Sequence, residues 1–494
     1  MTIGTAMRAA SFRPTIAAKL AACLGLTAAA DWLFYGHGTG WTAGLFAFSL
    51  ISTLCLLQPA LVRHKPSQVI ATALIALSVA MMNAPEPLTL YLFASGVATL
   101  LVLHKRDMAL NAVLLAKDML RLSFRTLSQW RVDSKRCEKA ILRLKLPRGG
   151  IRRGMVFAVF PATLAAVFIY LFSEANPVLA AALAKLDWGY WTAILLSPGR
   201  WLFWGAVAAV IWALLRPRFR LSKPVTMSLA GVGTSAWVSR RSLVFSLVLF
   251  NIIFAIQNGF DLAFLWTGQG AFPAGVDYAD YVHAGAYPLI VTALLAGGYV
   301  LLTFDNAQAA LRSNAATALV TVWVLQNVFL VASSIDRTLN YIESYSLTYL
   351  RVAALIWMGL VAVGLLLVLA RIYLNRSNMW LINVNALVLT GILYACCFMN
   401  FGGMIAHYNV HHARELGGKG VSLDLGYLRE IGPDAIPALR WYVGELEVGW
   451  NRQYGGIVLK ELEDGLARDT SDWRLWTWRK QRLFGDNDNA TVLR

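Results

Sequence analysis

The sequence is poor in charged residues. Asp, Glu, Lys and Arg together make up only 14% of the 494 residues, whereas 58% are hydrophobic. Roughly a quarter of the residues of a soluble domain are charged. The composition therefore argues against a soluble protein with a single core and against a disordered chain, and it favours a polytopic membrane protein.

The sequence also lacks the short motifs of common catalytic and metal sites. Its five cysteines form no CxxC or Cys/His spacing, so neither a disulfide framework nor a zinc knuckle is expected. No GxSxG, HExxH or complete phosphate-binding loop is present. The glycine-rich stretch Gly417–Gly420 is interpreted as a flexible turn. We therefore predict no cofactor and assign no catalytic residue.

Long apolar runs dominate the chain instead. A helix needs roughly 17–25 apolar residues to cross a bilayer, and these runs are too continuously apolar for barrel strands. The predicted fold is all-α, a polytopic transmembrane helix bundle of about eleven spans. The expected spans are 15–35, 42–62, 68–84, 87–103, 154–173, 198–215, 242–266, 288–304, 314–335, 350–370 and 379–401.

Positive charge is distributed unevenly between the loops. With a cytoplasmic N-terminus, the inner segments hold 27 Lys and Arg residues, and the outer loops before the tail hold four. Because Lys- and Arg-rich loops stay in the cytoplasm, we predict a multi-pass protein of the bacterial inner (cytoplasmic) membrane. Its N-terminus would be cytoplasmic and its C-terminus periplasmic. A signal peptide cleaved after Ala28-Ala29-Ala30 is the alternative to a retained first helix.

The basic inner loop 104–153 is predicted to contain an amphipathic helix. Lys117, Arg121 and Arg125 form a stripe four residues apart, beside apolar positions that include Leu120 and Phe124. Such a helix lies on a bilayer surface and attracts anionic lipid, although a protein or nucleic-acid contact would fit the same pattern. We interpret the net charge of +17 as loop retention together with lipid contact, and we expect no nucleic-acid partner.

Two domains are predicted, a transmembrane domain over 1–402 and a C-terminal helical extracytoplasmic segment over 403–494. The tail holds 12 basic and 13 acidic residues, unlike the strongly basic chain before it. Ser422 is expected to cap a helix over 423–431, which Gly432-Pro433 would end, and further helices are expected over 451–467 and 472–483. The tail is also a candidate docking surface for an envelope protein partner.

Polar side chains inside or at the edge of the spans are the main functional candidates. Ionisable groups in a membrane are costly and often functional, whereas amides also serve to hold helices together. Both a polar substrate path between the spans at 242–266, 314–335 and 379–401 and structural hydrogen bonding fit this pattern. The candidates are Asn251, Gln257, Asn258, Asp261, Gln326, Asn327, Asp336, Arg337, Glu343, Arg351, Asn383 and Asn385.

A weaker metal candidate follows the last span. On a continuous helix, His407, His411 and Glu415 are each four residues apart and share one face. Two imidazoles and a carboxylate could hold zinc with a site open to water. Histidines at a membrane interface, or satisfied within the protein, would explain the same residues.

Several blocks of the second half resemble a known family in unchanged order. The similar blocks are Phe250–Trp266, Tyr287–Ile290, Gln326–Leu330, Trp380–Asn385, Tyr408–Glu415 and Leu423–Arg429. Together they resemble a bacterial multi-pass membrane family that is known only as a domain of unknown function, the DUF4153/DUF4173-like group. The resemblance covers roughly 240–480 and implies no activity, cofactor or catalytic residue. The first 150 residues carry no such resemblance.

These observations favour a non-enzymatic inner-membrane protein. It would bind or transport a polar solute, or relay an envelope signal, through the polar faces of the three spans named above. One alternative is a membrane-embedded enzyme that acts on a lipid or envelope glycan through the histidines or the carboxylates Asp261 and Asp336. A scaffold for a membrane complex, docked through the tail, is the other.

Overall fold

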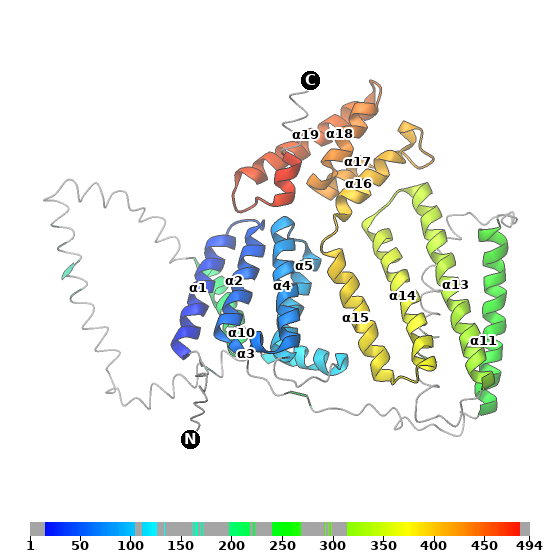
Figure 1. The fold of residues 1–494 in the computed structure, drawn as a ribbon. Coiled ribbons are helices and arrows are strands. Elements are labelled where there is room, and N and C mark those ends of the chain that lie inside the picture. The colour runs from blue at the N-terminus through cyan, green and yellow to red at the C-terminus, as the bar shows by residue number, and fades with distance from the viewer. Residues whose placement is uncertain are drawn as a thin grey trace, which may run out of the picture. The chain divides into compact units, whose positions relative to one another are not determined.

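A computed structural model describes most of the chain, and every regular element in the described residues is helical (Figure 1). The chain divides into two compact units. The first comprises Met1–Ser78, Phe93–Asp107 and Ala116–Leu221, and the second comprises Val79–Leu92, Met108–Leu115 and Ser222–Arg494. The described residues are 15–103, 111–125, 133, 161, 164–165, 168, 171, 197–217, 221–222, 240–267, 292, 295, 298 and 314–484.

Apolar helices of membrane-spanning length recur through the described residues. Those long enough to cross a bilayer are α1 (Ile16–Phe34), α4 (Lys65–Asn83), α10 (Pro198–Leu215), α11 (Arg240–Asp261), α13 (Asn314–Tyr345), α14 (Tyr349–Tyr373) and α15 (Asn378–Cys396). The shorter α2 (Thr42–Leu57) and α5 (Pro87–Leu103) are also apolar. These helices confirm the prediction of a helical membrane protein. The predicted spans 154–173 and 288–304 lie almost entirely outside the described residues, so a count of eleven stays a prediction.

The first unit is built around α1, which packs against α10 and α2. At one end of this helix pair, Arg200 donates two hydrogen bonds to Asp31, at 2.8 and 2.6 Å. Tyr35 lies beside them, and its hydroxyl is 3.2 Å from that of Ser197. The short helix α3 (Pro59–Arg63) follows α2. A paired bidentate contact of this kind satisfies both charges, which suits a site where helices leave the apolar layer.

The basic loop contributes a helix over residues 112–125. Leu120 and Phe124 are well exposed on it, at 60% and 73%, whereas Leu114 and Leu122 are buried. A helix with exposed apolar side chains suits a membrane surface. Its contact with anionic lipid stays a prediction.

In the second unit, α11, α13, α14 and α15 lie side by side (Figure 1). A short π-helical turn, η2 (Leu262–Trp266), extends α11. The ring of Trp323 fills the space between α11 and α13 and stacks on Phe250, with ring centroids 5.1 Å apart. Met358 and Leu365 of α14 complete this core.

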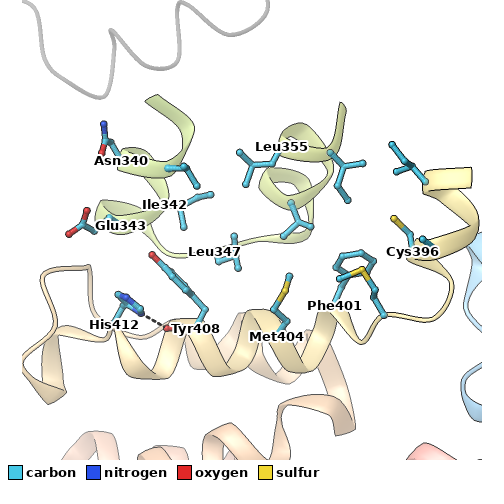
Figure 2. A pocket seen from close by; sticks show the side chains of 16 residues that line it. Asn340, Ile342, Glu343, Leu347, Leu355, Cys396, Phe401, Met404, Tyr408 and His412 are labelled. Carbon is cyan, nitrogen blue, oxygen red and sulfur yellow. Dashed lines mark hydrogen bonds between the residues drawn. The ribbon is translucent and has the colours of Figure 1, made fainter. Parts of the chain in front are cut away.

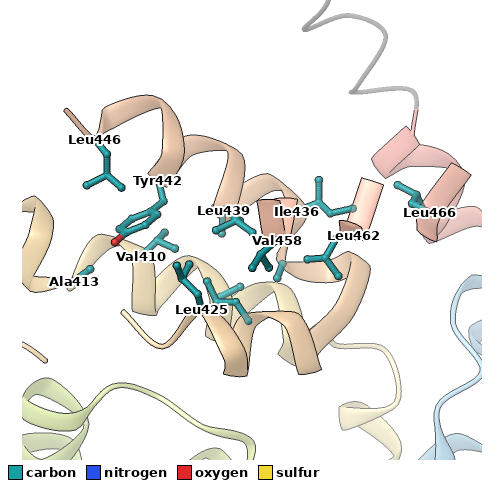
Figure 3. Packing of buried hydrophobic residues seen from close by; sticks show 14 residues of the cluster. Val410, Ala413, Leu425, Ile436, Leu439, Tyr442, Leu446, Val458, Leu462 and Leu466 are labelled. Atoms are coloured by element: carbon teal, nitrogen blue, oxygen red, sulfur yellow. The ribbon is translucent and has the colours of Figure 1, made fainter. Parts of the chain in front are cut away.

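The tail is a small helical assembly with its own apolar core (Figure 3). Its elements are α16 (Phe401–His411), η4 (Arg414–Leu416), α17 (Leu425–Ile431), η5 (Gly432–Ala435), α18 (Ile436–Glu445) and α19 (Trp450–Ser471). Leu428, Ile436, Leu439 and Leu466 are fully buried in that core. The predicted domain boundary at 402/403 falls inside α16, whose Ala406 and Val410 belong to the core of the tail.

Helix ends in the tail differ from the predicted ones. Asp424, rather than Ser422, caps α17, because its carboxylate accepts the Tyr427 N–H at 2.9 Å. Gly432 ends that helix with a positive φ of 83°, as expected for a glycine after a helix. The helix predicted over 451–467 continues to Ser471, and the next helical residues begin at Trp478.

Candidate functional site

Helices α11 and α13 contact each other through a polar stripe. The inward positions of α11 recur every three or four residues: Leu247, Asn251, Phe254, Asn258 and Asp261. The Asn251 side chain donates to the Leu319 carbonyl at 3.0 Å, and Asn258 donates to the Gln326 carbonyl at 3.1 Å. The same offset along both helices shows that they run parallel. These two amides thus form hydrogen bonds between the helices.

Asp261, the last residue of α11, forms a buried ion pair with Arg337 of α13. The Asp261 side chain is 0% exposed and that of Arg337 is 4% exposed. Gln257 donates to the same carboxylate at 3.2 Å. A charge buried in this way persists only when an opposite charge and hydrogen bonds compensate it. Of the predicted ionisable candidates, these two are brought together.

The other ionisable candidates have different partners. Asp336 accepts a hydrogen bond from Asn340 at 3.3 Å, and Glu343 lies 3.8 Å from Lys419 of the tail. Arg351 donates to backbone carbonyls of the turn between α13 and α14. These ionisable candidates therefore make separate contacts. Asp336 and Glu343 lie on α13, which continues ten residues beyond the predicted end of the span at 335.

Buried amide oxygens line the same pair of helices. Within the described part of the chain, the side-chain oxygens of Asn251, Asn258, Gln326 and Asn327 have no hydrogen-bond partner. Asn327 is fully buried, and its amide nitrogen donates to the Trp323 carbonyl of its own helix at 2.8 Å. These oxygens are acceptors that a hydrogen-bond donor could satisfy.

The amides of α15 lie apart from this stripe. Asn383 accepts the Ala112 N–H at 2.9 Å. Asn385 donates to the Leu381 carbonyl at 2.9 Å and lines a cavity of about 500 Å³ next to Gly364 of α14. Because α14 packs against both α13 and α15, Asn385 lines a cavity that includes no residue of the α11–α13 stripe.

The histidine face predicted as a weak metal candidate is not continuous with Glu415. Helix α16 ends at His411, and Glu415 lies in the following 3-10 turn. Both Glu415 oxygens lie 3.2 Å from the Leu423 nitrogen, while His411 stacks between His407 and Trp441. Across the described residues, no group of three potential ligands is close enough to hold a metal.

Helix α16 is shared by two apolar cores. One face contributes Ala406 and Val410 to the core of the tail. The opposite face contributes Ile405 to a second cluster with Ile342 and Leu347, at the end of the α13–α14 hairpin. An amphipathic helix with two buried faces joins the elements on either side of it. The sequence did not predict this role, because the last span was expected to end at Phe401, the first residue of α16.

A buried amide fixes α16 to the α13–α14 turn. The Asn409 side chain accepts the Leu347 N–H at 2.6 Å and donates to the Leu347 carbonyl at 2.9 Å. The Tyr427 hydroxyl of α17 accepts a hydrogen bond, at 2.9 Å, from the backbone N–H of Tyr349, the first residue of α14. Within the turn, Ser346 has a left-handed backbone with a φ of 73°. The tail thus satisfies the backbone groups that a strained turn leaves open.

A cavity of about 710 Å³ lies between α16 and the ends of α13, α14 and α15 (Figure 2). Its polar lining residues, Asn340, Glu343, Tyr408 and His412, gather at one end. The opposite end is apolar and includes Cys396 and Phe401. Burial and the Glu343 carboxylate raise the pKa of Tyr408, so its hydroxyl stays protonated at neutral pH. A single acid, Glu343, was the only sequence signal for this cavity.

Comparison with known proteins identifies one family. A family model described as "Domain of unknown function (DUF4153)" matches residues 69–441. The match begins far before the predicted resemblance at 240, within α4, and it ends within α18. No curated protein and no solved structure matches the chain.

Proposed function

The chain belongs to the DUF4153 family, which is described as a domain of unknown function, and we propose that it relays a signal from the bacterial cell envelope without catalysing a reaction. In this proposal the tail over 403–494 lies in the periplasm and binds an envelope partner. A change in the position of the tail is transmitted to the α13–α14 hairpin, which consists of these two helices and the turn between them. The single observation that supports the relay is the sharing of α16 between the two cores.

The orientation rests on loop charge. The segments assigned to the cytoplasm hold 27 Lys and Arg residues, and the outer loops hold four. A periplasmic reporter enzyme fused after Arg494 should therefore be active, and a fluorescent protein that folds only in the cytoplasm should be dark. The reverse result would place the tail in the cytoplasm and contradict the proposed direction of the relay.

The Asn409 contact offers a direct test of coupling. Asn409→Ala removes the acceptor of the Leu347 N–H and should raise amide hydrogen exchange at 347–349, while the core of the tail stays protected. A matched control is Asn451→Ala on the exposed surface of α19, which should leave exchange unchanged. Unchanged exchange at Leu347 in the Asn409 variant would contradict the coupling.

The cellular test follows from the same substitution. If the relay is the function, Asn409→Ala at wild-type protein level should reproduce the phenotype of a strain that lacks the protein. The Asn451→Ala strain should behave as wild type. A normal phenotype in the Asn409 strain, with coupling lost in the exchange experiment, would contradict the relay.

Passage of a polar solute is a second candidate function, and the buried amide oxygens of α11 and α13 favour it. Those four acceptors could bind a donor-bearing solute or a cation. Proteoliposomes loaded with labelled amino acids, sugars or alkali cations would test this. Flux that depends on Asn327, and is lost in Asn327→Leu, would support a path. Equal flux with and without the protein would contradict it.

A further inference from the structure

The cavity beneath α16 has the polarity of an amphiphile. Twelve of its sixteen lining side chains are apolar, and the four polar ones gather at one end (Figure 2). Its volume of about 710 Å³ falls within the range of small-molecule sites, roughly 300–1,000 Å³. A ligand that filled it would need an apolar chain and a polar head at opposite ends.

The cavity lies at the level where a membrane supplies such molecules. The apolar part of α13 runs from Ala315 to about Ser334, which covers roughly the 30 Å hydrocarbon layer at 1.5 Å per residue. Residues 339–343, which line the cavity, therefore lie beyond the hydrocarbon, in the headgroup layer. The apolar end is lined by Cys396 and Met399 at the end of α15, toward the hydrocarbon.

The apolar end is also accessible from the side. Met399 and Met404 line the cavity and remain 46% and 40% exposed. Their neighbour Phe398 is 50% exposed. Flexible, exposed methionines next to an apolar cavity suit the entry of acyl chains of varied shape. A lipid could therefore enter from the surrounding bilayer without crossing water.

The charges at the polar end select the headgroup. Glu343 is the only residue with a full charge among the described lining residues, and its contact with Lys419 is a solvent-exposed pair at 3.8 Å. Exposed pairs of this kind are weak, so an ammonium group could replace Lys419 at the carboxylate. The displaced Lys419 could then contact a phosphate.

We propose that this cavity binds a zwitterionic aminophospholipid, with its ammonium group at Glu343 and one acyl chain in the apolar end beneath α16. The Tyr408 hydroxyl, protonated at neutral pH, donates a hydrogen bond to the phosphate. This site does not depend on the proposed relay, because Asn409 faces the Leu347 backbone and is not part of the cavity lining.

Native mass spectrometry on the full chain tests the site. The protein is purified from nanodiscs of phosphatidylethanolamine and phosphatidylglycerol in equal amounts. We expect one retained phosphatidylethanolamine per chain. Retention of phosphatidylglycerol in preference, or of no lipid at all, would overturn the proposal.

Substitutions then distinguish recognition of the lipid headgroup from binding of the acyl chain. Glu343→Gln should reduce the preference for phosphatidylethanolamine roughly three-fold, and Glu430→Gln, an exposed acid of α17, should leave it unchanged. Met404→Trp should fill the apolar end and abolish lipid retention, whereas Leu387→Trp on the exposed face of α15 should retain it.

A second cavity-filling variant controls for a folding defect in the test of acyl-chain binding. If Met404→Trp lowers the yield of monodisperse protein, Ala395→Leu fills the same cavity from α15 and should also abolish retention. Lipid retained by a well-folded cavity-filled variant would overturn the proposal. Asn409→Ala should keep its bound lipid, which distinguishes failure of the relay from failure of this site.

Discussion

Helix α11 buries a charged side chain and exposes large apolar ones, whereas the large aliphatic side chains of α18 are buried. On α11, Ile253 and Phe260 are 53% and 54% exposed, while Asp261 is fully buried. On α18, Ile436 and Leu439 are fully buried. In water, apolar burial drives packing, but lipid is as apolar as leucine, so packing in a membrane depends on polar contacts and close fit. The comparison therefore shows that the two helices are adapted to different solvents.

The ion pair of α11 and α13 should give the largest effect. Arg337→Met leaves the Asp261 carboxylate buried without its guanidinium, which should cost about 3–5 kcal/mol of unfolding free energy. Combining it with Asp261→Asn should recover much of that loss, since no buried charge then remains. Unfolding in mixed micelles with increasing dodecyl sulfate measures both. An equal loss of unfolding free energy in the single and double variants would show that the unpaired Asp261 charge is not the cause of the loss.

Apolar truncation should affect the two helices unequally. Leu439→Ala in the core of the tail should cost about 2–5 kcal/mol. The matched truncation Ile253→Ala on α11 should change stability by less than about 0.5 kcal/mol, because that side chain already faces its solvent. Thermal unfolding of the purified variants provides the comparison. Similar losses at both positions would contradict the assignment of lipid as the solvent of α11.

Removing one interhelical amide should have a smaller effect. Asn258→Leu eliminates the hydrogen bond to the Gln326 carbonyl, and a bond of this kind within a membrane contributes about 0.6 kcal/mol. The variant should therefore unfold at slightly lower denaturant than wild type. Asn451→Leu, at an exposed position of the tail, serves as control. A gain in stability at position 258 would mean that the amide is retained for function instead.

The last effect, which is absent at neutral pH, should be a change with pH confined to the tail. Burial and the Glu415 carboxylate raise the pKa of Tyr442 to about 12, against a pKa of about 10 in the unfolded chain. The folded state holds the proton more tightly, so this contribution to stability is complete below pH 10 and is lost between about pH 10 and 12. Melting curves of wild type should fall across this window more steeply than those of Tyr442→Phe. Parallel curves would contradict the raised pKa.

Apolar runs predicted the membrane helices well, because length and hydropathy are properties of the segment itself. The predicted end of the span at 335 was wrong as the end of α13, for a physical reason. Asp336 and Glu343 were placed beyond the predicted span, because they end the apolar run, but they do not end the helix. A helix continues into the headgroup layer wherever neighbours satisfy its side chains, and those neighbours are distant in sequence.

The junction at α16 was harder to predict. The run 379–401 was interpreted as one span, whereas α15 ends at Cys396 and Asn400 caps a new helix by accepting the Gly403 N–H at 3.0 Å. An asparagine inside an apolar run followed by two glycines was an available signal for that break. The partners of Asn409 and the cavity depend on packing between distant segments, which no local pattern contains.

A covalent link and several non-covalent contacts hold the tail to the membrane helices of its unit. Residues 397–400 join it covalently to α15, and Asn409 ties it to the α13–α14 turn. A domain attached at one point rotates about that point, whereas a second attachment prevents this rotation. A partner that binds and rotates the tail would therefore transmit that rotation directly to the α13–α14 hairpin.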